Sequence, residues 1–342
     1  MSDAAPAPEI ADGPPHYLAI QRHAPEEAVA LVEAAMAAHV RRVGKDTIGA
    51  SHAVYFLTLE DGREVVARLA IHADHDLARD LWATEVCRRH GVPAPEVLAA
   101  RTDRSRGTPF AVLSRLPGHP AKDVTLAPHE RAVVFEQMGR YLARIHRVHL
   151  AGYGELQPAE GAGAGSPLEA RYAGMAPSLF DFVLSGVKRT LGELDALRSH
   201  PSWPTEALPA AYVERLLACY TREHDRLNLQ DSVLVHGDYR LKNALLDGSR
   251  VTGIVDYELG TAGDPAMDLA WLRFQDVRTD AEWSAVWRGY GSAPNASLER
   301  RLLLYELWWT LRRLWWDVMT HDAEETVESL ANLDRIVEQL DG

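Results

Sequence analysis

The chain has 342 residues, of which 46% are hydrophobic and 25% charged, so it is long and apolar enough for one large domain or two unequal lobes with real cores. Its formal net charge of -13 argues against a general nucleic-acid binder, because affinity for phosphate backbones comes from clustered lysine and arginine. Cys87 and Cys219 are the only cysteines, which excludes a disulfide framework. The acidic balance suits a cationic partner, although it also serves solubility alone.

Residues 1–20 are rich in alanine, proline and acidic side chains, and we expect them to form a disordered tail. They lack the basic start and apolar core of a secretory signal. Elsewhere, no uninterrupted apolar run approaches the length of a membrane span. These features predict a cytoplasmic protein without a membrane partner.

The first predicted helix covers residues 25–43. Apolar residues recur at helical spacing from Val29 to Val40, Pro25 suits a first turn, and Gly44 suits the residue after a helix end. The pattern is that of an amphipathic helix.

A hairpin, a helix and a further strand follow. Residues 53–59 and 64–71 are rich in valine, tyrosine, phenylalanine and leucine, and the Asp-Gly pair at Asp61 separates them, which predicts a β-hairpin. A helix is expected over about 76–90, and residues 110–116 supply another apolar strand.

From these elements we predict two lobes. Residues 21–116 form a small N-terminal lobe of mixed structure with a β-sheet. Residues 117–342 form a larger, mostly helical lobe, interrupted by a glycine-rich loop near Gly161 and by short strands between 233 and 256. The predicted fold class is therefore α+β.

The segment HGDYRLKN, residues 236–243, carries the most chemical information, together with GIVDYE at 253–258. Phosphoryl transfer to a hydroxyl needs a carboxylate near the attacking group, oxygen ligands for Mg²⁺ and positive charge facing the phosphates. Asp238 can supply the carboxylate, because it follows an apolar strand at a turn where Gly237 lets the backbone bend.

The other two requirements are met close by. Asn243 offers an amide oxygen and Asp256 a carboxylate at a strand end, which are ligands that Mg²⁺ accepts. Arg240 can stabilise charge on the transferring phosphoryl group, and Lys242 either does the same or faces solvent. Each of these residue types is common in turns, so it is their joint order and spacing that predicts a site.

The run HGDYRLKN with Asp256, followed by GDPAMDLAW, resembles the aminoglycoside phosphotransferase and choline kinase superfamily, relatives of the protein kinases. The resemblance implies a bilobal protein-kinase-like fold, with Asp238 as catalytic base and Asn243 and Asp256 as metal ligands. It implies that Asp264 and Asp268 brace the catalytic loop rather than take part in the chemistry.

The resemblance also assigns nucleotide contacts in the N-terminal lobe. The phosphate-covering loop falls on IGASHAVY, which contains Gly49 and Ser51. No lysine lies on the second hairpin strand, so Arg68 takes the place of the cation that holds the α and β phosphates. Asp80 or Glu85 orients this arginine, and the spacing favours Asp80.

Backbone groups from Ser114 to Leu116 are expected to hold the adenine. His146 and His236 are interpreted as buried structural residues. Four tryptophans recur at heptad-like spacing near the C-terminus, and they form either a buried helix stripe or part of the acceptor pocket. They are Trp308, Trp309, Trp315 and Trp316.

The sequence thus predicts a Mg²⁺-dependent kinase that transfers the γ-phosphate of ATP or GTP to a hydroxyl of a small acceptor, such as an aminoglycoside, another antibiotic, a sugar or an amino alcohol. A non-catalytic nucleotide-binding module is the first alternative, and the retained Asp238, Asn243 and Asp256 argue against it. A protein kinase is the second. Asp264 follows Asp256 too soon to leave an activation segment.

Overall fold

The computed structural model describes the chain except for residues 1–22, 45–46, 49–51, 72–75, 164 and 205–206. The expected tail, Gly49 and Ser51 lie outside the described residues. By its internal contacts the chain divides into two compact units, and the first comprises the residues up to Leu77 together with Val97–Arg115. The second comprises Ala78–Glu96 and Leu116–Gly342.

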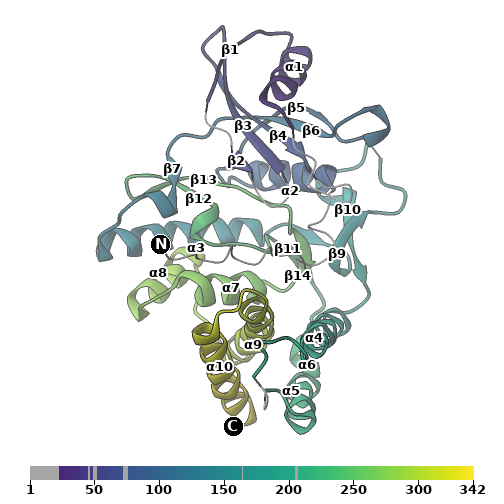
Figure 1. The fold of residues 1–342 in the computed structure, drawn as a ribbon, viewed down its shortest axis with the longest axis vertical. Coiled ribbons are helices and arrows are strands. Elements are labelled where there is room, and N and C mark those ends of the chain that lie inside the picture. Colours follow the sequence, from purple (N-terminus) through teal and green to yellow (C-terminus); the bar gives the residue numbers. More distant parts are fainter. Residues whose placement is uncertain (1–22, 45–46, 49–51, 72–75, 164, 205–206) are drawn as a thin grey trace, which may run out of the picture. The chain divides into compact units, whose positions relative to one another are not determined.

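An antiparallel sheet forms the first unit, with strand order β1-β3-β4-β6-β5 and the short β2 paired to β3 (Figure 1). One helix packs on it through Ala28 and Val32, which join the buried side chains of the strands. The elements are α1 (Pro25–Met36), β1 (Val40–Val43), β2 (Thr47–Ile48), β3 (His52–Leu59), β4 (Glu64–Ala70), β5 (Val97–Arg101) and β6 (Phe110–Ser114).

The expected hairpin is confirmed as β3 and β4, whereas the first helix is shorter than predicted. It ends at Met36, because Ala37 adopts the left-handed conformation with φ of 48°. Residues 40–43 then pair with β3, where Val40 lies opposite Leu59. The apolar spacing that includes Val40 fits a strand edge as well as a helix, so periodicity alone could not separate the two.

The second unit holds two small sheets, ordered β10-β9-β14-β11-β8 and β13-β12-β7. Its strands are β7 (His119–Pro120), β8 (His149–Leu150), β9 (Tyr153–Pro158), β10 (Tyr172–Ala176), β11 (Ser232–Val235), β12 (Ala244–Asp247), β13 (Arg250–Ile254) and β14 (Thr261–Gly263). The sequence analysis expected the strands near 233–256 but not β8, β9 or β10, which are short or rich in glycine and polar residues.

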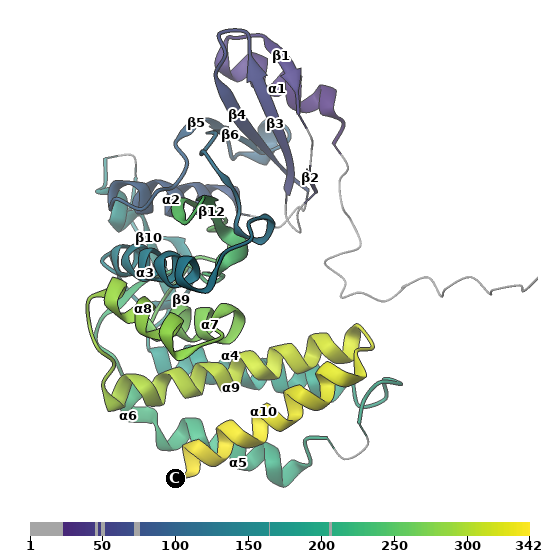
Figure 2. The same ribbon diagram turned by 90° about the vertical axis from the view of Figure 1, so that its left-hand side faces the viewer.

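Helices make up most of the rest of this unit, and none in the described part of the chain is long and apolar enough to cross a membrane. Figure 2 shows α9 and α10 lying side by side. The helices are α2 (Leu77–Arg89), α3 (Pro128–Ile145), α4 (Leu179–Ala196), α5 (Ala210–Arg222), α6 (His224–Leu227), α7 (Ala266–Asp276), α8 (Asp280–Tyr290), α9 (Ala296–Met319) and α10 (Ala323–Asp341).

Helix α2 differs from the expected lobe division, which placed it with the N-terminal sheet. Its buried residues Ala83, Val86 and Cys87 belong to the large core of the second unit. The Trp82 indole also donates a hydrogen bond to the Leu168 carbonyl, 2.7 Å away. The amphipathic pattern predicted a helix with a buried face but could not tell which core that face joins.

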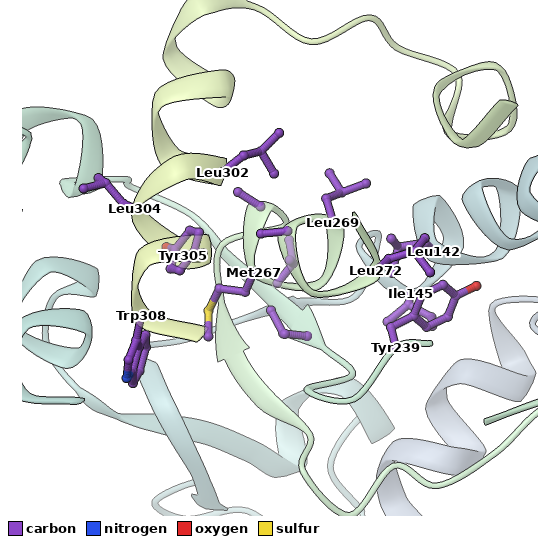
Figure 3. Packing of buried hydrophobic residues seen from close by; sticks show 14 of the residues in the cluster. Leu142, Ile145, Tyr239, Met267, Leu269, Leu272, Leu302, Leu304, Tyr305 and Trp308 are labelled. Carbon is purple, nitrogen blue, oxygen red and sulfur yellow. The ribbon is translucent and has the colours of Figure 1, made fainter. Parts of the chain in front are cut away.

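The core of the second unit is built around α7. Figure 3 shows Met267, Leu269 and Leu272 of α7 between side chains of α3 and α9, and all three are buried. Tyr239, next to the predicted base, enters the same core, and its hydroxyl donates to the Met138 carbonyl at 2.7 Å. The predicted catalytic loop is therefore fastened to the largest apolar cluster of the chain.

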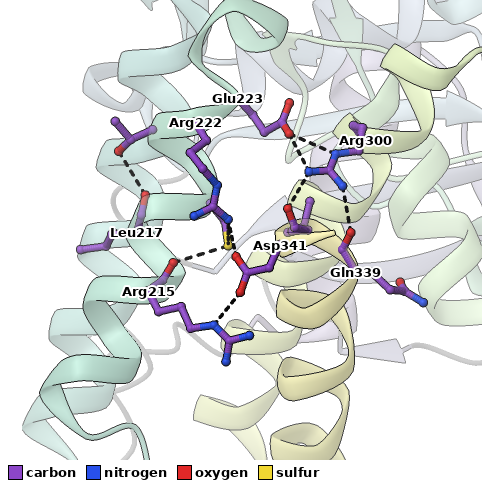
Figure 4. A network of polar contacts seen from close by, with 10 residues as sticks. Arg215, Leu217, Arg222, Glu223, Arg300, Gln339 and Asp341 are labelled. Atoms are coloured by element: carbon purple, nitrogen blue, oxygen red, sulfur yellow. Dashed lines mark hydrogen bonds and ion pairs between the residues drawn. The ribbon is translucent and has the colours of Figure 1, made fainter.

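A network of ion pairs ties the C-terminal helix α10 to α5 and α9 (Figure 4). Asp341 accepts hydrogen bonds from Arg215 and Arg222, and Arg300 donates to the buried Glu223 at 2.8 Å. Arg300 also donates to the Gln339 and Leu340 carbonyls, which are among the unpaired acceptors at a helix end.

Glycines allow α3 and α8 to pack in backbone contact. A Cβ added at Gly289 of α8 would lie 1.8 Å from the Glu136 carbonyl oxygen of α3, and one at Gly139 of α3 would lie 2.1 Å from the Val286 oxygen of α8. No real side chain fits at such distances, so the two helices would have to separate.

We expect Gly289→Ala to destabilise the protein by about 1–3 kcal/mol or more, because overpacking forces backbone shifts. The matched control is Gly192→Ala in α4, where an added Cβ meets nothing within 4 Å. That change should stabilise by about 0.5–1 kcal/mol through helix propensity. Urea unfolding of both variants at pH 7 measures the difference, and equal effects would contradict the packing argument.

Candidate active site

Asp238 follows β11 in a sharp turn that requires glycine. Gly237 has φ of 83°, and a Cβ there would lie 2.2 Å from the Leu259 carbonyl oxygen. His236 is fully buried: its Nε2 lies 3.2 Å from the Val255 carbonyl, and the Asp238 amide lies 3.3 Å from its Nδ1. Both contacts form when the proton is on Nε2, so His236 shapes the turn as the sequence analysis expected.

The buried carboxylate of Asp268 holds this turn from α7. It accepts the His236 amide at 2.7 Å and the Gly237 amide at 3.0 Å, and His146 Nε2 lies 3.2 Å from it. Nδ1 of His146 lies 2.9 Å from the Tyr290 hydroxyl, so this histidine is buried with both nitrogens in contact with partners. These contacts are those of a brace behind the loop.

Asp264 fixes the start of α7 in a similar way. Its carboxylate accepts the Ala266 amide at 3.0 Å, Arg301 Nε at 2.7 Å and the Tyr305 hydroxyl at 3.2 Å. Asp264 is fully buried, and its contacts join α7 to α9. Nothing in this environment gives it access to a substrate.

The Asp238 carboxylate is largely buried and contacts three donors. Asn243 Nδ2 lies 2.9 Å from Oδ2, and Lys242 Nζ lies 3.0 Å from the same oxygen. The indole of Trp271 donates to Oδ1 at 2.8 Å. Lys242 thus pairs with the carboxylate instead of pointing away into solvent.

Asn243 and Asp256, the expected metal ligands, lie on neighbouring strand ends. Ala244 of β12 pairs with Ile254 of β13, and the backbone amide of Val255 donates to the backbone carbonyl of Asn243 at 3.0 Å. Asp256 comes directly after this contact. Asn243 Nδ2 is used by Asp238, so its Oδ1 is the atom available to a cation.

Asp256 has φ of 74°, in the left-handed region that few residues other than glycine adopt. Asparagine and aspartate tolerate this region best, and strained backbone of this kind concentrates at functional sites. Two oxygen ligands suffice for Mg²⁺, which takes its other ligands from phosphates and water. The donor set of Asn243 and Asp256 therefore fits this ion.

Arg240 is the residue expected to stabilise charge on the transferring phosphoryl group, and that role stays a prediction. Its Nε is buried and has no hydrogen-bond partner among the residues that the structure describes. Its charge acts on Asp276, the last residue of α7, whose carboxylate accepts the Leu241 amide at 2.6 Å. Burial raises the pKa of Asp276, while the Leu241 amide and Arg240 oppose this rise.

Two of the predicted nucleotide contacts, Arg68 and Ser114, lie on the sheet of the first unit. Arg68 of β4 is half-buried, and its Nη2 lies 2.9 Å from His52 Nδ1 on β3. Ser114 ends β6 opposite Val65 of β4. These positions agree with the expected strands, and the roles of Arg68 and Ser114 toward a nucleotide stay predictions.

The second unit contains the predicted contacts Asp80 and Leu116, together with the alternative Glu85. Asp80 is fully buried in α2, whereas Glu85 is bonded by Arg88 and Arg89 of its own helix. Leu116 packs over Gly253 of β13, since a Cβ there would lie 2.7 Å from its Cδ1. Which of the two carboxylates, Asp80 or Glu85, orients Arg68 stays a prediction.

The tryptophan stripe of α9 is only partly buried. Trp308 is 3% exposed and stacks on Trp309 at 5.2 Å, whereas Trp316 is 53% exposed. Trp309 in turn meets the Trp271 ring edge-on at 5.1 Å. The expectation of a buried stripe is therefore confirmed for Trp308 and wrong for Trp316, and Trp309 lies beside the ring that contacts Asp238.

Sequence reasoning missed two residues that contact the loop, Trp271 and Asp276. Trp271 ends the GDPAMDLAW run, and Asp276 follows five residues later. An acidic residue at a helix end is unfavourable for the helix dipole, which was the one signal for Asp276.

We expect Asp276→Asn to keep the hydrogen bond from the Leu241 amide. Its free energy of unfolding at pH 7 should equal or exceed that of the wild type, because the substitution removes the cost of burying a carboxylate charge. Asp276→Ala should lose about 1–3 kcal/mol, since it leaves the amide unpaired. Urea denaturation measures both.

The pH dependence of stability tests the direction of the Asp276 pKa shift. Because the folded-state pKa of Asp276 is raised, the folded wild type binds more protons than the unfolded chain as pH falls below neutral, so its stability increases relative to Asp276→Asn. The advantage of Asp276→Asn should shrink between pH 7 and pH 4. An advantage that grows on acidification would contradict the buried-carboxylate interpretation.

Comparisons with known proteins show the family and the fold of this chain. The family model described as the phosphotransferase enzyme family matches residues 43–305. Acyl-CoA dehydrogenase family member 10 of Mus musculus is 29% identical over 234 residues, which cover 65% of this chain and 19% of that protein. The chain therefore spans about a fifth of the length of this relative.

Two solved structures share the fold. A thermostable mutant of aminoglycoside phosphotransferase APH(4)-Ia, in a ternary complex with ADP and hygromycin B, has a TM-score of 0.65 at 18% identity over 92% of this chain and 99% of that chain. A putative fructosamine-3-kinase from Thermobifida fusca has a TM-score of 0.63 at 16% identity over 92% and 100%. The expected kinase-like α+β fold is confirmed, and the chain belongs to the phosphotransferase enzyme family.

Proposed function

We propose that the protein transfers the γ-phosphate of ATP or GTP to a hydroxyl group of a small molecule, with Asp238 as the general base. The observation that carries the proposal is the joint placement of Asp238 and Asn243. The side-chain amide of Asn243 donates a hydrogen bond from Nδ2 to the Asp238 carboxylate and offers Oδ1 to a cation. A carboxylate, hard oxygen ligands and a nearby lysine are the parts that phosphoryl transfer requires.

Four residues of the catalytic loop and Asp256 then have chemical roles, and among them Arg240 stabilises charge on the transferring phosphoryl group. Asp238 accepts the proton of the acceptor hydroxyl, while Asn243 Oδ1 and Asp256 hold Mg²⁺. The bound ion would neutralise charge on the nucleotide phosphates. Lys242, paired with Asp238 at 3.0 Å and half-exposed, is placed to contact a phosphoryl oxygen once the acceptor arrives.

The nucleotide contacts are proposed from the sequence and the family. Arg68 holds the α and β phosphates, and Asp80 is the carboxylate that orients it. Backbone groups from Ser114 to Leu116 bind the purine ring of the nucleotide. The segment with Gly49 and Ser51 covers the phosphates.

The acceptor is proposed as a class. The APH(4)-Ia structure contains hygromycin B, an aminoglycoside, and the Thermobifida fusca protein is named a putative fructosamine-3-kinase. The mouse relative carries the name of an acyl-CoA dehydrogenase family, which makes hydroxyacyl thioesters a further acceptor worth testing. The net charge of -13 favours cationic acceptors within this set.

The decisive experiment measures transfer from γ-labelled ATP and GTP with Mg²⁺ to aminoglycosides, macrolides, fructosamines, amino alcohols and a hydroxyacyl-CoA. We expect one acceptor class to be phosphorylated and Asp238→Ala to lower kcat by about 10²–10⁴, the usual contribution of a general base. Nucleotide binding by this variant should persist. Nucleotide binding without transfer to any acceptor by the wild type would favour a non-catalytic binding module.

Asp256→Asn separates the metal role from the backbone role. Asparagine tolerates the left-handed conformation, so we expect unfolding within about 0.5 kcal/mol of wild type. Loss of the carboxylate should raise the Mg²⁺ concentration needed for half-maximal transfer by at least about tenfold. A Mg²⁺ titration of initial rates measures this, and an unchanged requirement would remove Asp256 from the metal site.

A further inference from the structure

Trp271 has no role in the proposal so far, although its indole contacts the base. Nε1 donates to Asp238 Oδ1 at 2.8 Å, across 33 positions of sequence. We propose that Trp271 is a positioning residue that fixes the Asp238 carboxylate and leaves Oδ1 as the oxygen that takes the proton. The inference rests on the proposed function for its kinetic consequence but not for the bond itself.

The choice of oxygen follows from counting donors. Oδ2 is contacted by both Asn243 Nδ2 and Lys242 Nζ, at 2.9 and 3.0 Å. Among the described residues, Oδ1 accepts the N–H of the Trp271 indole. A carboxylate offers about four lone-pair sites, two on each oxygen, so Oδ1 keeps one acceptor site for a hydroxyl proton while Oδ2 is filled.

The indole suits this position because it only donates. Trp271 Nε1–H cannot accept the proton that Oδ1 is to receive, and it carries no charge that incoming phosphates would attract. A lysine or arginine here would be drawn toward a phosphoryl group. The indole therefore holds the carboxylate through the reaction without competing for the proton or the phosphate.

The ring itself is held by its neighbours on two helices. Trp271 meets Trp309 of α9 edge-on at 5.1 Å and Phe274 of its own helix at 6.1 Å. Asp268, one turn earlier on α7, bonds the amides of His236 and Gly237. The same helix thus fixes both the backbone of the loop and the side chain of the base, which sets their distance.

Trp271→Phe tests the proposal, because it removes the N–H and keeps an aromatic ring. Trp287→Phe is the matched control, since Trp287 of α8 is buried, its Nε1 has no hydrogen-bond partner among the described residues, and its ring meets Trp283 and Tyr290. Both variants change tryptophan to phenylalanine. Thermal unfolding shows that each is folded before activity is compared.

The kinetic arm uses MgATP as the sole substrate, with water in place of the acceptor hydroxyl, and follows phosphate release. We expect Trp271→Phe to lower kcat roughly 10- to 100-fold with an unchanged KM for ATP, the effect of a misplaced base. Trp287→Phe should stay within about twofold of wild type. Equal kcat values for the two variants, or a change confined to KM, would overturn the proposal.

The spectroscopic arm follows the bond without catalysis. In protein with ¹⁵N-labelled tryptophan, the Trp271 and Trp287 indole signals are assigned by their loss in the two phenylalanine variants. Asp238→Ala should move the Trp271 N–H proton upfield and leave Trp287 in place. A Trp271 signal that does not move rejects the bond. If wild type releases no phosphate, the proposed function fails while this signal still decides for or against the contact.

Discussion

The catalytic loop depends on one buried carboxylate. Asp268 is fully buried, and an ionised carboxylate in such a place is costly unless donors surround it. The amides of His236 and Gly237 supply short hydrogen bonds to it, and His146 adds a third contact. Asp268 needs hydrogen bonds from those two amides, and the amides reach its carboxylate only when the chain turns at Gly237. The turn that presents Asp238 is thus the geometry that satisfies the buried charge.

Helix α7 extends this constraint along the loop. Asp268 bonds the backbone before Asp238, Trp271 contacts the Asp238 side chain, and Asp276 bonds the Leu241 amide. The helix is itself fixed, because Asp264 bonds Arg301 of α9 and its apolar side chains pack between α3 and α9. A rigid helix with three contacts to one loop leaves that loop little freedom. Catalytic groups held in this way lose less rate to misplacement than groups on a free loop.

The sequence predicted the site residues that are close to one another along the chain and missed those that are far from them along the chain. Asp238, Asn243 and Asp256 lie within one strand-turn-strand segment, where spacing in sequence translates into spacing in space. Trp271 and Asp276 contact that segment across 33 and 35 positions, and no periodicity or turn rule relates residues so far apart. The same limit explains α2, whose buried face was evident while its partner core was not. It also explains Val40, where a single apolar residue fitted both a helix and an edge strand.

The identity of residue 243 shows how closely the base and the metal ligands are linked. Asn243 donates Nδ2 to Asp238 and keeps Oδ1, so one amide serves the base with its nitrogen and a cation with its oxygen. An aspartate at this position would lose the donor and place a second negative charge beside Asp238. A serine would be too short to do both. The side-chain amide also sits at a fixed point, because the backbone carbonyl of Asn243 accepts a hydrogen bond from the backbone amide of Val255, next to Asp256. Only a side chain with a donor and an acceptor on one planar group meets both demands, which is why this position links the chemistry of the hydroxyl to that of the phosphate.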